Sequence, residues 1–434
     1  MRKLLLSIVL SLYLTSSIGS HLMGGQITAR NIGGLTYEVT LTLYRDTLGI
    51  PMYTTALVYY FDSLSNPIFT RNVFVGQPTA IGNGVEKYAY IDTVTFPNSG
   101  TFRAHFYDCC RNAAILNIGS GAGSGNLYLD NIIYADSTNS SPIFLNDPIT
   151  IAQDSVPFSY NPSPFDIDGD SLSWTMDIPM DYIAGSPTGV PFPIYFLPPG
   201  DSANPFTLNP VTGEITFTPT AIGNFQISVK AIEYRNGIAI GSIRRDMQLI
   251  VIPSPNTPIV VVSTPNIYRM SPTAGTTSAP TYVNPGQHLQ FLFDAYNYDN
   301  GPIETTVSGT AFFAATPAVV TSNNPFTNFG FFTNTHTIID WYPTQADVRS
   351  TPYNIIFRCA DFYGPYKFYN DHTYAVYVTN TPLGIDDPTA STGNNALLIK
   401  TCDILGREVP KDTKGLVVRM YSDGSAQKVF VFED

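Results

Sequence analysis

The feature that most constrains the fold is a strict two-residue alternation of apolar and polar side chains. Residues 35–44 read LTYEVTLTLY, and the alternation puts five apolar residues on one face: Leu35, Tyr37, Val39, Leu41 and Leu43. Because successive side chains of a β-strand point to opposite faces, this pattern predicts a half-buried strand. Similar short segments, separated by turn residues, occur at 56–61, 87–94 and 101–107. Such spacing is typical of a β-sandwich.

The composition favours an all-β chain. Of the 34 acidic residues 27 are Asp and 7 are Glu, and Lys occurs 8 times. Glu and Lys favour helices, whereas Asp, the 33 Gly and the 34 Pro favour turns and caps. This composition excludes coiled coils, helical bundles, collagens and disordered tails. The net charge of −12 argues against a nucleic-acid partner, which requires a basic face.

The N-terminus predicts export. Arg2 and Lys3 precede the apolar run LLLSIVLSLYL at 4–14, and small polar residues follow up to Ser20. This order is that of a secretory signal peptide, so residues 1–20 are expected to be removed. The run is too short to span a bilayer, and the next most apolar stretch, 249–262, is broken by prolines. We therefore expect a secreted protein with no transmembrane span in the mature chain.

The four cysteines matter because export permits disulfides. Cys109 and Cys110 are adjacent, Cys359 lies far downstream and Cys402 lies near the C-terminus. The sequence does not choose among the pairings that four cysteines allow. Cys109 and Cys110 are candidates for a vicinal disulfide, and two reduced thiols are the alternative. No zinc site is expected, because no second Cys/His cluster has ligand spacing.

An internal repeat occupies the centre of the chain. The motif ITFTPT at 215–220 has a similar copy, IDWYPT, at 339–344. An alternating segment follows each copy, at 225–232 and at 353–360. Self-similarity at a fixed period indicates repeated structural modules. We therefore predict two homologous β-sandwiches.

The repeat and the changes in composition divide the chain into parts. After the signal peptide we predict an N-terminal β-sandwich at 21–140, a central cadherin-like one at 141–253, its diverged copy at 254–383, and a linker with a small C-terminal β domain at 384–434. Pro253, Pro255 and Pro258 lie between the two copies. Proline stiffens a linker and cannot donate a hydrogen bond to a sheet. We therefore expect the two repeated modules to be separate and joined by a short, stiff linker.

Three sequence motifs in the central region support a family resemblance. They are DIDGDSLSW at 166–174, NPVTGEITFTPT at 209–220 and EYRNGIAIGSIRRDMQ at 233–248. They resemble the cadherin-like and immunoglobulin-like repeats of bacterial surface proteins, and with the second copy the likeness covers about half of the chain. The resemblance implies tandem sandwiches on a cell surface.

Both ends of the chain carry further resemblances. ILGREV at 404–409 and KGLVVRMYSDGSAQKVFVFED at 414–434 look like a short C-terminal sorting domain of the type IX secretion system, although its usual upstream Asn-Pro word is missing. This implies delivery by that secretion machinery to the surface of a Gram-negative bacterium. SHLMGGQI at 20–27, LTLYRD at 41–46 and DCCRN at 108–112 look like the N-terminal domain of the same secreted family, which supplies architecture and no activity.

The sharpest chemical feature is the alternating triplet Asp166, Asp168 and Asp170. Carboxylates in a turn can converge on a hard cation, and Ca²⁺ accepts about six to eight oxygen ligands. The cadherin-like resemblance implies Ca²⁺ at a module junction; the alternative is a loop of solvated acids. The second copy has Asn297 and Asp299 in this place and has lost two carboxylates, so a second metal site there should be weaker or absent.

No enzymatic activity is expected. The five histidines lie in unrelated contexts, and His105 alternates with Phe102 and Phe106 as a structural residue would. Aspartate is so frequent that a chance acid/base pair does not indicate a glycosidase.

The alternative of a different class is a glycan-binding protein or an ancillary module of extracellular polysaccharide capture. Trp174, Trp341 and Tyr342 would form its sugar-stacking platform. Within alternating strands, however, such side chains more often pack in the core.

A recurring tripeptide motif has two interpretations. Asp-(Ser/Thr)-(apolar or Thr) resembles the O-glycosylation acceptor of bacteria with type IX secretion. The acceptors that the resemblance implies are Thr47, Ser63, Thr93, Ser137, Ser155, Ser171 and Ser202. Ordinary Asp-Ser/Thr turn chemistry is the alternative.

These patterns together predict a non-enzymatic, secreted cell-surface protein of tandem β-sandwiches. Its expected roles are adhesion, surface structure or support of gliding motility. The expected partners are the secretion machinery, through the C-terminal domain, and a surface protein or glycan that the sequence does not identify. Ca²⁺ is the one cofactor that the motifs imply.

Overall fold

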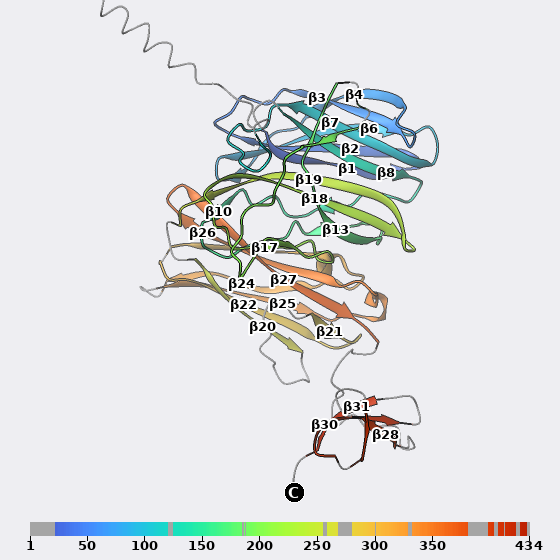
Figure 1. The fold of residues 1–434 in the computed structure, drawn as a ribbon, viewed down its shortest axis with the longest axis vertical. Coiled ribbons are helices and arrows are strands. Elements are labelled where there is room, and N and C mark those ends of the chain that lie inside the picture. The colour runs from blue at the N-terminus through green and yellow to red at the C-terminus, as the bar shows by residue number, and fades with distance from the viewer. Residues whose placement is uncertain are drawn as a thin grey trace, which may run out of the picture. The chain divides into compact units, whose positions relative to one another are not determined.

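The computed structural model describes most of the chain. The described residues are 22–119, 125–184, 186, 188–254, 258–267, 280–299, 301–328, 332–380, 398–402, 407–411, 413–421 and 426–431. The predicted signal peptide lies outside them. The chain forms two compact units, one ending at Val378 and one beginning at Thr379. The described residues form strands and short 3₁₀ turns without an α-helix, which confirms the predicted all-β class (Figure 1).

No helix in the described part of the chain has the length and the apolar character needed to cross a membrane.

The N-terminal module, defined here as β1 to β8, contains every strand predicted in this region. Its strands are β1 (Leu22–Gly33), β2 (Thr36–Asp46), β3 (Thr55–Asp62), β4 (Pro67–Val75), β5 (Thr79–Gly82), β6 (Val85–Thr95), β7 (Gly100–Cys109) and β8 (Asn126–Ala135). On β2 the side chains of Tyr37, Val39, Leu41 and Leu43 are fully buried. The period-two pattern therefore marks the core-facing side of the strand, as predicted.

The central module comprises β9 to β19. Its strands are β9 (Ile143–Phe144), β10 (Ile151–Gln153), β11 (Phe158–Tyr160), β12 (Pro164–Phe165), β13 (Ser171–Asp177), β14 (Met180–Asp181), β15 (Val190–Pro191), β16 (Thr207–Leu208), β17 (Ile215–Phe217), β18 (Gly223–Arg235) and β19 (Ile238–Ile252). The long hairpin β18–β19 forms the main sheet with β13 on one side and β10, parallel to β19, on the other. A short sheet in the order β11-β17-β16 also contributes to the module's core.

The third module is a complete sandwich. Its elements are β20 (Val260–Ile267), β21 (Thr281–Val283), β22 (Leu289–Asn297), β23 (Ile303–Ser308), η2 (Thr310–Phe313), β24 (Val319–Asn328), β25 (Thr333–Trp341), η3 (Gln345–Asp347), β26 (Tyr353–Tyr363) and β27 (Tyr366–Val378). One sheet has the order β20-β22-β25-β24 and the other β21-β27-β26-β23. Apolar side chains of both sheets, such as Phe293 and Phe357, meet in one core.

The predicted internal repeat reappears as a shared strand order. In the central module β10 lies parallel to β19, followed by β18 and β13; in the third module β21 lies parallel to β27, followed by β26 and β23. The order β11-β17-β16 likewise matches β22-β25-β24. The strands that follow ITFTPT and IDWYPT, β18 and β26, occupy the same place in the two modules.

The C-terminal unit is a small sheet described in part. Its strands β28 (Leu398–Cys402), β29 (Glu408–Val409), β30 (Gly415–Tyr421) and β31 (Ala426–Val431) pair in the order β29-β28-β30-β31. β30 and β31 pair antiparallel, in agreement with the small C-terminal β domain predicted for 384–434.

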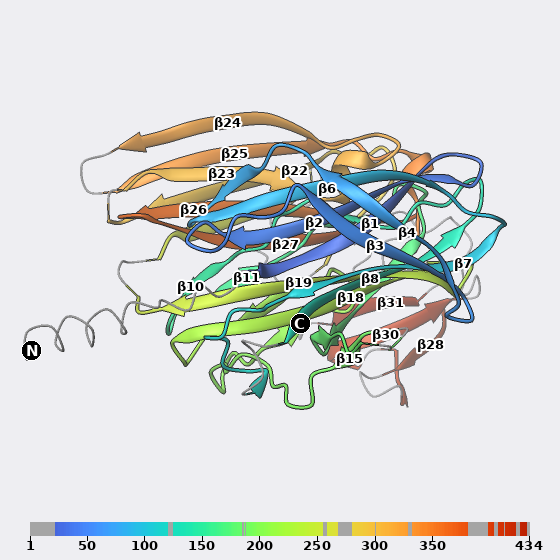
Figure 2. The same cartoon turned by 90° about the horizontal axis from the view of Figure 1, so that it is seen from above.

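The N-terminal and central modules share a sheet. β19 pairs with β1 at Gly24 and Gly25 and with β8 at Ser242 and Ile243. Figures 1 and 2 both show β19 beside the strands of the N-terminal module. An unpaired strand edge exposes a row of backbone donors and acceptors, and β19 covers the edges of both β1 and β8. The expectation that the central and third modules stand apart is wrong, because buried hydrogen bonds join them: the backbone N–H of Asn161 donates to Asp371 Oδ2 at 2.8 Å and its side-chain amide donates to Thr373 Oγ1 at 3.0 Å.

The contact between β1 and β19 depends on a glycine. Gly24 has φ of +146°, and a Cβ atom there would collide with the backbone carbonyl of Asp246 on β19. Gly33, at the other end of β1, has a similar φ of +134° but faces open space. The two glycines therefore share the backbone constraint and differ only in their surroundings.

We expect Gly24→Ala to destabilise the protein by about 1–3 kcal/mol more than Gly33→Ala, because only the first forces β1 away from β19. Equilibrium urea unfolding of both variants of the full mature chain measures the difference. Equal losses of stability would show that close approach to β19 is not what Gly24 provides.

Candidate functional site

The loop between β12 and β13 is shaped by its own first aspartate. Oδ1 of Asp166 accepts hydrogen bonds from the backbone N–H groups of Asp168, at 2.9 Å, and Asp170, at 3.0 Å. Gly169 takes the left-handed φ of +84° that the turn requires. These local hydrogen bonds, typical of aspartate in turns, fix the shape of the loop, and the bonds of Asp170 with Arg235 connect it to β18.

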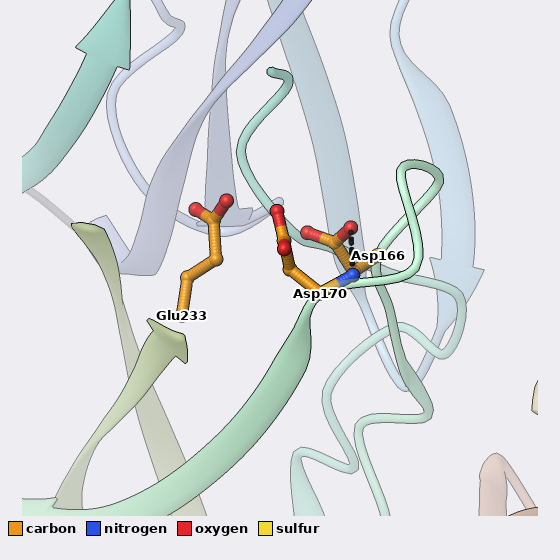
Figure 3. Close-up of side chains that lie close together, drawn as sticks. All are labelled: Asp166, Asp170 and Glu233. Carbon is orange, nitrogen blue, oxygen red and sulfur yellow. Dashed lines mark hydrogen bonds between the residues drawn. The ribbon is translucent and has the colours of Figure 1, made fainter. Parts of the chain in front are cut away.

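Three carboxyl groups meet where this loop reaches β18. One oxygen each from Asp166, Asp170 and Glu233 lie within 4.8 Å of one another (Figure 3). Glu233 is on β18, where it pairs with Leu172 at the start of β13. Strand pairing therefore brings a residue that is distant in the sequence into the acidic loop. We call Asp166, Asp170 and Glu233 the acidic group.

Burial makes the acidic group unusual. Asp166 is 7% exposed and Glu233 is 1% exposed. Desolvation, reinforced by the neighbouring carboxylates, raises the pKa of Asp166 to about 7 and the pKa of Glu233 to about 9. Among the residues that the structure describes, Oδ2 of Asp166 and Oε1 of Glu233 have no hydrogen-bond partner. At neutral pH the carboxyl group of Glu233 therefore retains its proton.

Arg235 connects the acidic group to the N-terminal module. Its guanidinium binds both carboxylate oxygens of Asp170, with Nη2 2.5 Å from Oδ2. The same guanidinium donates to Asp136 Oδ2 at 3.2 Å and to Asn139 Oδ1 at 2.5 Å. Asp136 and Asn139 belong to the segment that follows β8. The site thus lies at the junction of the first two modules.

Asp168, predicted as the third metal ligand, does not belong to this group. Its Oδ2 accepts a hydrogen bond from the backbone N–H of Ser140 at 2.5 Å. The structure therefore brings together two of the three predicted aspartates and adds Glu233, which the sequence analysis missed. The word EYRN contains both Glu233 and Arg235, but nothing in its spacing indicates the distant loop that they face.

The weaker metal candidate in the second copy has structural partners. The side-chain amide of Asn297 donates to Asp361 Oδ1 at 2.7 Å, and its carbonyl accepts from the backbone N–H of Asp299 at 2.8 Å. Asn297 is fully buried, whereas Asp299 is exposed. The Asn-x-Asp motif is therefore part of the turn that follows β22.

The cysteines separate into two kinds. The structure joins Cys109, at the end of β7, to Cys110 by a disulfide and leaves Cys359 and Cys402 as buried thiols. Burial raises the pKa of the Cys359 thiol to about 12, so this cysteine is a poor nucleophile. The oxidation state of the native pair remains a prediction.

The candidate glycan acceptors lie mostly at the surface. Six of them are exposed: Thr47, Ser63, Thr93, Ser137, Ser155 and Ser202. Ser171 is half-buried and donates to the carbonyl of Tyr234 at 3.2 Å. In four of the seven words the aspartate accepts a hydrogen bond from the backbone N–H two residues on: Asp46, Asp62, Asp136 and Asp201. Hydrogen bonding of the aspartate within a turn accounts for these four motifs. Glycosylation remains a prediction.

Both tryptophans pack in the core, as the sequence favours, so neither can form the sugar-stacking platform of the glycan-binding alternative. Trp174 is 4% exposed and Trp341 is 1% exposed, and both belong to hydrophobic cores. Tyr342 is exposed and stacks on His288 with ring centroids 4.2 Å apart. Because a buried ring cannot stack on a sugar, any glycan site must lie elsewhere. His105 is buried among aromatic rings, as expected of a structural histidine.

Comparisons with known proteins add little to this geometry. No family model and no curated protein matches the chain. Among solved structures, it is similar to Escherichia coli alpha-2-macroglobulin activated by porcine elastase, with 11% identity over 80% of this chain and 31% of that one and a TM-score of 0.20. It is also similar to zebrafish RET cadherin-like domains 1 to 4, with 9% identity, coverage of 83% and 73%, and a TM-score of 0.18. The chain spans about a third of the E. coli protein's length. TM-scores this low support no inference about function.

The acidic group predicts a stability that depends on pH. The folded-state pKa values of Asp166 and Glu233 lie above their ordinary values, so the folded protein binds more protons than the unfolded chain between about pH 4 and about pH 9. Without a metal ion, we therefore expect the melting temperature to fall as pH rises through about 7 and on towards about 9.

Differential scanning calorimetry in chelator-containing buffer measures this slope. Glu233→Gln keeps the shape of the side chain and removes its titration, so its profile should be flatter. Glu38→Gln, on the surface of the N-terminal module, is the matched control. A wild-type melting temperature that rises across this pH range would contradict the assignment.

Proposed function

We propose that this chain is a non-enzymatic protein of the cell surface in a Gram-negative bacterium, where it serves adhesion or surface structure, including support of gliding motility. The observation that carries the proposal is the continuous β unit ending at Val378, in which strands of different modules share one sheet. Such shared pairing suits a part that transmits load between its ends. The signal-peptide pattern and the resemblance of the C-terminal unit to a type IX sorting domain support export and delivery by the secretion machinery.

The second element of the proposal is that the acidic group holds Ca²⁺ at the junction of the first two modules. Its ligands would be carboxylate oxygens, which Ca²⁺ prefers. When ionised, the three carboxylates of Asp166, Asp170 and Glu233 carry three negative charges, and Arg235, which also pairs with Asp136, compensates only part of them. A divalent cation would reduce the remaining negative charge. The oxygens of Asp166 and Glu233 that lack a hydrogen-bond partner are available as ligands.

Proton release is the signature of this site. Because Glu233 retains its proton at neutral pH, Ca²⁺ must displace that proton in order to bind. The affinity should therefore increase between about pH 7 and about pH 9. A solvated surface cluster of acids would show no such dependence, because its carboxylates are already ionised at neutral pH.

Isothermal titration of the full mature chain with CaCl₂ at both pH values tests the site. We expect binding heat, a rise in melting temperature that is larger at about pH 9, and proton release in buffers of different ionisation enthalpy. Glu233→Gln and Asp166→Asn should weaken binding about tenfold or more. Asp168→Asn is the matched control and should bind as the wild type does.

Two outcomes would contradict the calcium proposal. One is the absence of both heat and stabilisation at about pH 9. The other is binding that is lost in Asp168→Asn and retained in Glu233→Gln, which would place the cation on the turn alone.

The cellular part of the proposal is tested on native material. We expect mass spectrometry of the surface fraction to find a mature N-terminus near Ser20 and no peptides from the C-terminal unit, because type IX sorting domains are removed during delivery. The same measurement reports glycans on the exposed acceptors and the thiol state of Cys109 and Cys110. Recombinant chain from a host without this secretion system is the control. An intact C-terminal unit in a periplasmic fraction would overturn the sorting assignment.

A further inference from the structure

A cleft of about 560 Å³, lined by polar and apolar side chains, lies between the central and third modules. One wall comes from β11, β17 and the segments on either side of β16, which hold Asn204 and Asn209; the other comes from β27. The volume is within the range of about 300–1,000 Å³ that is typical of small-ligand sites. None of the residues of the acidic group lines this cleft, which is therefore a separate site.

The two walls are joined by buried hydrogen bonds. The backbone N–H of Ser159 donates to Asn370 Oδ1, and that of Asn161 donates to Asp371 Oδ2, both at 2.8 Å. The amide of Asn161 also donates to Thr373 Oγ1 at 3.0 Å. These bonds fix the width of the cleft before any ligand binds, so binding does not have to order it.

The cleft carries little charge. Burial raises the pKa of Glu214 to about 7 and lowers the pKa of His372 to about 4, so the imidazole is neutral at neutral pH and the carboxyl is largely so below it. Asp371 is paired with Arg358, whose Nε lies 2.6 Å from Oδ1. The described residues that line the cleft include neither Lys nor Arg. An anionic ligand would meet no cation here, and a cationic ligand would find no unpaired, fully ionised carboxylate.

The lining is instead rich in groups that both donate and accept hydrogen bonds. The amides of Asn204 and Asn209 and the hydroxyl of Thr216 line one side, and the ring of Tyr377 lies on the other. Part of their capacity is used within the wall, where Asn204 Nδ2 donates to Thr218 Oγ1 and Asn209 Oδ1 accepts from the backbone N–H of Val211. A purely apolar ligand would leave their remaining donors and acceptors buried and unpaired. A polyhydroxylated ligand can satisfy amides and hydroxyls together, because each of its hydroxyls also donates and accepts.

We propose that this cleft binds an uncharged carbohydrate. Such a ligand matches a fixed, nearly neutral cavity whose walls present amides, hydroxyls and an aromatic ring. The binding is independent of the acidic group, so it stands whether or not that group holds Ca²⁺. It also replaces the buried tryptophans as the place where a glycan would be recognised.

The experiment screens the full mature chain against a glycan array that carries neutral xylan-, mannan- and cellulose-derived oligosaccharides beside alginate and sulfated oligosaccharides. The neutral oligosaccharide with the strongest signal is then titrated calorimetrically. We expect neutral sugars to be retained and the affinity to be unchanged between low and high salt, because no ion pair forms.

Two variants locate the binding in the cleft. Val211 lines the cleft and is 48% exposed, so Val211→Trp should fill the cleft without disturbing the core and should weaken binding about tenfold or more. Glu214→Gln should weaken it as well, because it replaces a carboxyl oxygen, which can accept a hydrogen bond from a sugar hydroxyl, with an NH2 group that cannot. Ile222→Trp, an equally exposed position of the same module outside the cleft, is the matched control.

Retention of no neutral glycan, or of charged glycans alone with an affinity that falls as salt rises, would overturn the proposal. So would binding that survives Val211→Trp and Glu214→Gln unchanged in proteins with the wild-type melting temperature.

Discussion

The rest of the structure depends on a buried ion pair between two modules. Arg111, just after β7, and Asp246, on β19, are both fully buried, and their guanidinium and carboxylate form two parallel hydrogen bonds of 2.7 and 2.9 Å. Removing either partner would leave a buried charge uncompensated, at a cost of about 3–5 kcal/mol. The pair therefore requires β19 to lie against the N-terminal module. That position closes the sheet over β1 and β8 and sets the place of β18, whose end carries Glu233 and Arg235.

The same junction accounts for several of the sequence motifs noted above. The glycines of LMGGQI let β1 approach the backbone of Asp246, DCCRN supplies Arg111, and SIRRDMQ supplies Asp246 together with two neighbouring arginines. Arg244 pairs with Asp130 of β8, and Arg245 donates to Gln26 of β1. These charged groups are bound to one another across the module boundary. Their role in the structure is therefore to fix the relative register of β1, β8 and β19.

Local features of the fold follow from the sequence, and the long-range pairings do not. The alternation in residues 35–44 depends only on neighbouring side chains, so it predicts β2 and its buried face. The repeat predicts that β18 and β26 occupy equivalent places, because equal words fold alike. By contrast, nothing near Glu233 indicates Asp166, since their meeting results from the pairing of β13 with β18. The prolines near residue 255 likewise suggest separation, whereas hydrogen bonds from Ser159 and Asn161 hold the modules together.

The two joints of the large unit share one design. At the first, Arg235 pairs with Asp170 and reaches across to Asp136 and Asn139; at the second, Arg358 pairs with Asp371 and reaches across to the carbonyl of Asp147. Each ion pair holds its joint, and beside each lies a carboxyl group, Glu233 or Glu214, whose pKa is raised by burial. Their surroundings then decide what each carboxyl can do. Glu233 faces other carboxylates, which favours a cation or a proton, whereas Glu214 faces hydroxyls in an open cleft, which favours a neutral, hydroxylated ligand.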